Sequence, residues 1–315
     1  MSDKKIITVL GATGAQGGGL VRAVLADPGG PFAVRAVTRN AGSAKARALA
    51  ERGAEVVAAT LDDEESLRKA FEGAHGAFVV TSFWESMSAD VELAQAATAA
   101  RAAKAAGVAH VVWSTLEDTR EVLPVSDPRV PVLQGRYTVP HFDAKAEADA
   151  FFRDSGVPTT YLRSTFYWEG FTQGTGPARG EDGRLVLTLP IGEAQLPGIA
   201  AEDIGRTAHG VFAAGDEYVG KTVSIAGEHL TGAQYAAAFA GALGEPVEYR
   251  PLTHEQFRSL GLPAGAEFGN MFQFYVEGER GFVGARDLDL VRSLNPRLQP
   301  FRSWLNEHIE AVRPA

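Results

Sequence analysis

The chain has 315 residues, 45% of them hydrophobic, and a formal net charge of −9 at pH 7. This length suits one large or two modest globular domains, and the acidic balance argues against direct nucleic-acid binding and against an anionic membrane partner. Because the chain has no cysteine, disulfides and thiolate catalysis are excluded. No apolar run is long enough to span a bilayer, and no signal sequence precedes the first strand, so we expect a cytoplasmic protein.

The N-terminal stretch predicts a nucleotide-binding turn. Residues 6–10 form an apolar run typical of a buried parallel strand, and apolar residues at helical spacing begin at Leu20. Between them, residues 11–17 read Gly-Ala-Thr-Gly-Ala-Gln-Gly. Glycines permit a tight turn and close backbone approach, and a helix N-terminus offers free N–H groups to a pyrophosphate. The expected cofactor contacts in this turn are Gly11, Thr13, Gly14, Ala15, Gln16 and Gly17.

The second predicted strand, residues 34–38, ends without the carboxylate that commonly binds the ribose 2′-hydroxyl of NAD. It ends instead at Thr38, Arg39 and Asn40. A guanidinium is planar and permanently charged, and it meets phosphate oxygens in a bidentate way. We therefore expect these three residues to hold the 2′-phosphate of NADP(H); the alternative is that Arg39 is a solvated loop charge.

Three further predicted strands end in candidate cofactor contacts. Residues 55–59 lead to Leu61 and Asp62, which we place at the adenine, although an N-cap role suits the aspartates equally well. The strand at 76–80 leads to a possible cofactor wall, and the strand at 110–114 ends at Ser114. The wall residues are Thr81, Phe83 and Trp84; the alternative for the two aromatic residues is ordinary packing.

The alternation of strands and helices predicts an α/β fold with a Rossmann-type doubly wound parallel sheet. We assign residues 1–155 to an NADP-binding domain and 156–315 to a smaller α/β C-terminal domain for a substrate or partner, with residues around 200–226 packing back on the first. The polar, proline-bearing segment 117–139 is long for a connection, which suggests a lid or an interaction loop.

A helix opening near His141 carries a second group of candidates. His141 and Lys145 are four residues apart, so they share a helix face if the helix already includes His141. A sixth strand at 159–163 is followed by Phe166 and Tyr167, which we also expect at the cofactor. Together with Trp84 and Trp168, these aromatic residues could line a cleft for an aromatic substrate; the alternative is that they are core residues.

Six segments spread along the chain carry a family resemblance: residues 11–18, 37–40, 80–85, 141–145, 152–158 and 270–275. Together they resemble the NmrA-like family of atypical short-chain dehydrogenases/reductases. The resemblance implies a Rossmann domain, a small C-terminal domain and a preference for NADP(H). It assigns cofactor contact to the glycine turn, Arg39, Thr81, Lys145 and the loop at Tyr167. The chain departs from the family pattern in segment 117–139 and in the loop after the sixth strand.

The same resemblance raises the question of catalysis. Ordinary short-chain dehydrogenases use Tyr-x-x-x-Lys, in which the tyrosine donates a proton and the lysine binds the nicotinamide ribose. Here Lys145 is present, but His141 stands at the tyrosine position. Histidine titrates near neutral pH and is a possible general acid, while a redox-sensing member of the family also has histidine there. Both residues are therefore tentative catalytic candidates.

Two functions remain open on the sequence. The first is a regulatory module whose response to NADPH and NADP+ is read by a protein partner; the missing tyrosine slightly favours it. The second is an NADPH-dependent reductase of a small carbonyl, quinone or aromatic molecule. No metal-ligand spacing is present, so no metal is expected, and either a monomer or a homodimer is expected.

Overall fold

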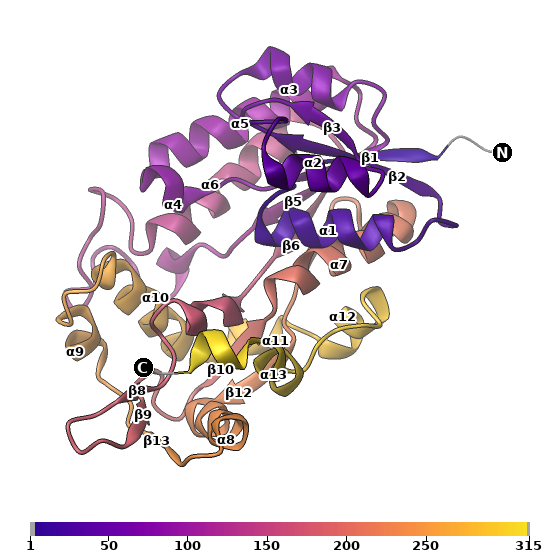
Figure 1. Cartoon of the computed structure of the whole chain (residues 1–315). Coiled ribbons are helices and arrows are strands. Elements are labelled where there is room, and N and C mark those ends of the chain that lie inside the picture. Colours follow the sequence, from indigo (N-terminus) through magenta and orange to yellow (C-terminus); the bar gives the residue numbers. More distant parts are fainter. Residues whose placement is uncertain (1–3, 314–315) are drawn as a thin grey trace.

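The computed structural model describes residues 4–313, and its centre is a parallel seven-stranded sheet (Figure 1). The strand order is β11-β6-β5-β4-β1-β2-β3. The reversal of order beside β1 is the doubly wound arrangement that the sequence predicts, so the predicted fold class is confirmed. The strands are β1 (Lys5–Val9), β2 (Phe32–Thr38), β3 (Glu55–Ala58), β4 (Gly76–Val79), β5 (His110–Thr115), β6 (Thr159–Arg163) and β11 (Thr222–Ser224).

Helices cover both faces of this sheet, which is why β4 and β5 are buried along their whole length. Helices α3, α5 and α6 pack together on one face, and α1 and α7 pack together on the other. The helices of this region are α1 (Ala15–Leu25), α2 (Ala44–Glu51), α3 (Glu64–Phe71), α4 (Phe83–Ser86), α5 (Ala89–Ala105), α6 (Pro140–Ser155) and α7 (Ala201–Ala213).

Glycines set how closely α1 and α7 approach each other. A Cβ atom on Gly205 of α7 would lie 2.2 Å from the backbone nitrogen of Leu20, and one on Gly19 of α1 would lie 2.5 Å from the carbonyl oxygen of Glu202. The two backbones therefore touch directly. This contact and the pairing of β11 with β6 place residues 201–224 with the sheet, and the contact holds α1 with its N-terminus at the carboxyl end of β1.

The remaining elements gather below the parallel sheet in the view of Figure 1. Two small sheets, ordered β12-β10-β7 and β13-β9-β8, pack with helices around a separate hydrophobic core rich in aromatic residues. The strands are β7 (Phe166–Tyr167), β8 (Ala178–Arg179), β9 (Leu185–Leu187), β10 (Gln195–Ile199), β12 (Glu228–Thr231) and β13 (Val247–Tyr249). The helices are α8 (Gly232–Leu243), α9 (His254–Arg258), α10 (Gly265–Glu277), α11 (Glu279–Gly284) and α13 (Phe301–Val312). Helix α12 (Leu288–Leu294) instead packs against α7, and its Val291 and Leu294 belong to the core beside the parallel sheet. Short 3-10 turns lie at Thr119–Glu121, Trp168–Thr172 and Gly215–Tyr218.

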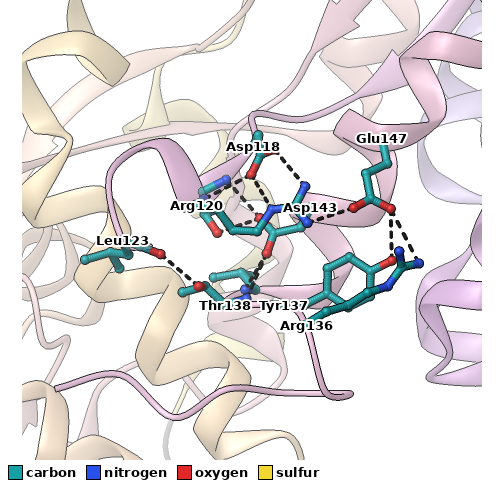
Figure 2. A network of polar contacts seen from close by, with 10 residues as sticks. Asp118, Arg120, Leu123, Arg136, Tyr137, Thr138, Asp143 and Glu147 are labelled. Carbon is teal, nitrogen blue, oxygen red and sulfur yellow. Dashed lines mark hydrogen bonds and ion pairs between the residues drawn. The ribbon is translucent and has the colours of Figure 1, made fainter. Parts of the chain in front are cut away.

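Segment 117–139 is anchored at both ends by one buried carboxylate, that of Asp143 (Figure 2). Its Oδ1 accepts hydrogen bonds from the Thr119 nitrogen at 2.9 Å and hydroxyl at 2.6 Å, while Oδ2 accepts from the Thr138 and Val139 nitrogens at 2.9 and 3.0 Å. Burial raises the pKa of Asp143, although these hydrogen bonds oppose the shift. The segment is thus tied to the first turns of α6 at both of its ends.

Candidate functional site

The glycine turn presents an open helix N-terminus at the carboxyl edge of the sheet. Gly11 lies two residues after the end of β1 and has a positive φ of 62°, and a Cβ on Gly17 would lie only 2.5 Å from the carbonyl oxygen of Gly11. Gly14 is the N-cap of α1, so no side chain caps the helix. Gly11, Gly14 and Ala15 are exposed, and Thr13 is half-buried beside them. The first-turn N–H groups and the positive end of the helix dipole are therefore open to an anion.

Three of the predicted cofactor residues join in one polar network across this turn. The Gln16 amide donates a hydrogen bond to the Tyr167 hydroxyl at 2.6 Å, and the Ser114 hydroxyl donates to the Gln16 carbonyl at 2.8 Å. Ser164 lies 3.1 Å from the same Tyr167 hydroxyl. Burial raises the pKa of Tyr167 to about 12, so it remains protonated at neutral pH. The network connects the glycine turn with the carboxyl ends of β5 and β6.

The residues after β2 are exposed, but the Arg39 side chain is engaged. Its Nη1 and Nη2 donate to the two carboxylate oxygens of Glu85 in α4, at 2.7 and 3.2 Å. Asn40 closes a local turn: its nitrogen donates to the Thr38 hydroxyl and its side chain accepts from the Gly42 nitrogen. Glu85 was not among the predicted residues, because nothing in the local sequence shows that α4 meets the end of β2.

The predicted adenine residues lie at the carboxyl end of β3. Leu61 packs at the edge of the core beneath α3 and α5. The Asp62 carboxylate accepts a hydrogen bond from the Gln95 amide at 3.0 Å. The N-cap of α3 is Asp63, which accepts from the nitrogens of Glu65 and Ser66.

Lys145 is buried in α6 with a complete set of partners. Its ammonium lies 2.7 Å from the Thr81 hydroxyl, 3.3 Å from the Thr81 carbonyl oxygen and 2.5 Å from a carboxylate oxygen of Glu92. It also lies 5.2 Å from the centre of the Trp113 ring. Glu92, in α5, is only 1% exposed. The one signal for Glu92 in the sequence is a carboxylate in an otherwise alanine-rich helix.

His141 is included in α6, as the predicted shared face requires, but its partner differs from that of Lys145. The His141 Nδ1 lies 2.6 Å from Oε1 of Glu267 in α10, and the same oxygen accepts from the His141 backbone nitrogen at 2.9 Å. The Trp84 ring lies 4.8 Å from the imidazole and stacks on Phe268 at 5.0 Å. The imidazole is thus oriented by a buried carboxylate and bordered by aromatic rings.

Most of the aromatic residues considered for the cleft pack in the core, which is the alternative that their pattern also allows. Phe166 and Trp168 are buried in the core of the C-terminal elements, and the Phe166 ring contacts that of Phe272 at 6.1 Å. Phe83 is 2% exposed and packs in a small cluster with Ala89, Tyr137 and Ala144. Trp84 alone of the predicted aromatic residues is largely exposed, at 43%. Aromatic residues after a strand suit a cleft or a core equally, and here most of them form core.

Asp149 makes the stability of the folded protein depend on pH. Its carboxylate accepts hydrogen bonds from Trp113 Nε1 at 2.8 Å and from the Thr115 hydroxyl at 2.6 Å. Burial nevertheless raises its pKa from an ordinary 3.8 to about 6. The folded chain thus keeps this proton to a higher pH than the unfolded chain. The group's stabilising contribution is complete below pH 3.8 and is lost as the pH rises through about 6.

We therefore expect Asp149→Asn to gain stability relative to the unaltered protein between pH 4 and pH 7, by about 2 kcal/mol after allowance for partial solvent screening. The amide oxygen retains both hydrogen bonds but does not titrate. Urea unfolding at a series of pH values measures the difference. Asp90→Asn, at a carboxylate with a 90% exposed side chain, is the control; equal pH profiles for both variants would contradict the assignment.

Two further properties bear on the site. Within residues 4–313, no helix is both long enough and apolar enough to cross a membrane. Over the same residues, no three histidine, aspartate or glutamate side chains gather as ligands for a metal ion.

Comparisons with known proteins place the chain in a family. The model of the NmrA-like family matches residues 3–294. The chain is 31% identical to the NmrA-like family domain-containing oxidoreductase malD of Malbranchea aurantiaca, with 99% of each chain covered. It superposes on crystal structures of NmrA, a negative transcriptional regulator, in complex with NADP (TM-score 0.77, 26% identity) and with NAD (TM-score 0.77, 25% identity), and 98% of this chain and 97% of NmrA are covered in both. With its doubly wound sheet and its open glycine turn, the chain belongs to the NmrA-like family.

Proposed function

We propose that the chain binds NADP(H) across the glycine turn and acts as a regulatory protein that responds to the state of this coenzyme. The observation that carries the binding proposal is the uncapped N-terminus of α1, with a guanidinium at the end of the neighbouring strand β2. The N-terminus of α1 suits a pyrophosphate, and the Arg39 guanidinium suits the 2′-phosphate. Complexes of NmrA with both NADP and NAD support a dinucleotide at this site.

The regulatory role is supported by the polar partners that the Lys145 ammonium already has. Its three donors already meet the Thr81 hydroxyl, the Thr81 carbonyl oxygen and Glu92, so a ribose hydroxyl has to displace one of these partners. The tyrosine that such a lysine serves in short-chain dehydrogenases is replaced by His141. Little turnover of the bound coenzyme follows from both features. In this proposal residues 1–155 bind the coenzyme, and the C-terminal elements present its state to a partner.

A second candidate function, an NADPH-dependent reductase, is favoured by the pair of His141 and Glu267. A carboxylate that fixes one imidazole nitrogen holds the tautomer and stabilises the imidazolium, which is the arrangement of many acid–base catalysts. In such a reaction the coenzyme supplies a hydride to a carbonyl carbon or quinone. His141 donates the proton to the oxygen, and Glu267 keeps the imidazole in position. The name of the malD relative as an oxidoreductase supports this candidate.

Calorimetric titration with NADP+, NADPH, NAD+ and NADH tests the binding proposal, and a panel of carbonyl and quinone substrates tests turnover through the loss of NADPH absorbance. We expect binding of NADP(H) and no oxidation above the rate in buffer. Absence of heat with all four dinucleotides would falsify the binding proposal. NADPH oxidation that is lost in His141→Gln and retained in His308→Gln would instead establish the reductase.

A further inference from the structure

Arg39 forms a bidentate ion pair with Glu85. The guanidinium that we assign to the 2′-phosphate therefore already has a carboxylate partner. We propose that Glu85 is a specificity-determining residue: its carboxylate competes with the 2′-phosphate for the Arg39 guanidinium, so that NADP(H), unlike NAD(H), binds by displacing it. This inference rests on the proposed binding of NADP(H) at the glycine turn.

The geometry of the pair carries the argument. The Glu85 oxygens take both Nη1 and Nη2 of Arg39, at 2.7 and 3.2 Å. A phosphate uses the same parallel pair of donors. Two anions cannot share one guanidinium fork without repulsion. The Nε–H group of Arg39 offers a second edge, but an anion there would still lie close to the Glu85 carboxylate and be repelled by it, so binding of the 2′-phosphate weakens the Arg39–Glu85 pair.

The pair is also weak enough to be displaced. The Arg39 and Glu85 side chains are 71% and 55% exposed. Exposed ion pairs contribute little, because water and salt screen both charges. A 2′-phosphate carries more charge than a carboxylate and is held in place by the rest of the bound coenzyme. Glu85 thus lowers the affinity for NADP(H) without preventing its binding.

Because Glu85 lies in α4, the replacement of its carboxylate by the 2′-phosphate at Arg39 is connected with the C-terminal elements. The preceding residue in the same four-residue helix, Trp84, stacks on Phe268 of α10 and borders His141. Release of Glu85 removes the contact that holds α4 to the end of β2. Trp84 is 43% exposed, whereas the other three tryptophans are at most 1% exposed. Accessibility of tryptophan to a soluble quencher therefore reports chiefly on α4.

Glu85→Gln tests the proposal. The amide is nearly isosteric and uncharged, so we expect the Kd for NADP+ to fall about three- to tenfold and the Kd for NAD+ to change by less than about twofold. The same gain is expected for 2′,5′-ADP over 5′-AMP, since these fragments differ only in the 2′-phosphate. Glu245→Gln is the matched control, because Glu245 forms a similar exposed bidentate pair with Arg179.

Iodide quenching supplies a second measurement on the unaltered protein. Saturating NADP+ should change the quenching of tryptophan fluorescence more than saturating NAD+ does, and Trp84→Phe should abolish the difference. The inference is overturned if Glu85→Gln leaves the NADP+ affinity unchanged, or raises the affinities for NADP+ and NAD+ equally, while the unaltered protein binds NADP+. In those cases the proposed function stands. If neither dinucleotide binds, the proposed function and this inference fail together.

Discussion

Arg39→Ala should weaken NADP+ binding about 100-fold and NAD+ binding by less than about threefold. The variant removes both charge-assisted hydrogen bonds to the 2′-phosphate, and such bonds are worth about 3 kcal/mol together, which corresponds to the expected factor. NAD+ lacks this phosphate, so it loses only a weak general attraction. Calorimetry with both dinucleotides at one fixed ionic strength measures the two changes.

Two variants sharpen this test. Arg39→Lys keeps the charge but not the planar fork, so its NADP+ affinity should lie between those of the alanine variant and the unaltered protein. Arg179→Ala removes an exposed guanidinium with a similar carboxylate partner, Glu245, and should leave both affinities unchanged. Equal losses of NADP+ and NAD+ affinity in Arg39→Ala would remove the assignment of Arg39 to the 2′-phosphate.

Lys145→Met should lower the free energy of unfolding by about 3–5 kcal/mol, because it leaves the carboxylate of Glu92 buried without its cation. Glu92 is 1% exposed and its Oε1 lies 2.5 Å from the ammonium. The double variant Lys145→Met with Glu92→Gln removes both charges and should recover most of the loss. Urea unfolding followed by circular dichroism measures the free energy of unfolding of the unaltered protein, of Lys145→Met and of the double variant.

The control for this comparison is Lys69→Met. Lys69 is 66% exposed and lies 3.6 Å from Glu65, so its loss should cost less than about 1 kcal/mol. If Lys145→Met is no more destabilising than Lys69→Met, the buried pair does not matter to stability. The same variants bear on function. A loss of activity in the single Lys145 variant combines the loss of a coenzyme contact with the loss of stability. The double variant separates these two effects, because it also lacks the lysine but should recover most of the stability.

The lysine and histidine of α6 show how far local patterns reach. Their spacing predicts one helix face, and α6 does include both residues. Yet Lys145 meets Thr81 and Glu92, while His141 meets Glu267. These partners come from other helices and from the end of β4, so the charge and orientation of each candidate depend on helix packing, which local spacing does not encode.

The amino-acid pattern was enough to predict the parallel sheet, the glycine turn and the arginine after the second strand. These features follow from short-range physics: apolar runs make buried strands, and glycines make the tight turn. Long-range packing was needed to show that Glu85 pairs with Arg39, that Glu92 pairs with Lys145, and that the aromatic residues at 166 and 168 form core. Each of these outcomes depends on which surfaces meet across the fold, and a carboxylate or an aromatic ring has the same local pattern in a site, an ion pair or a core.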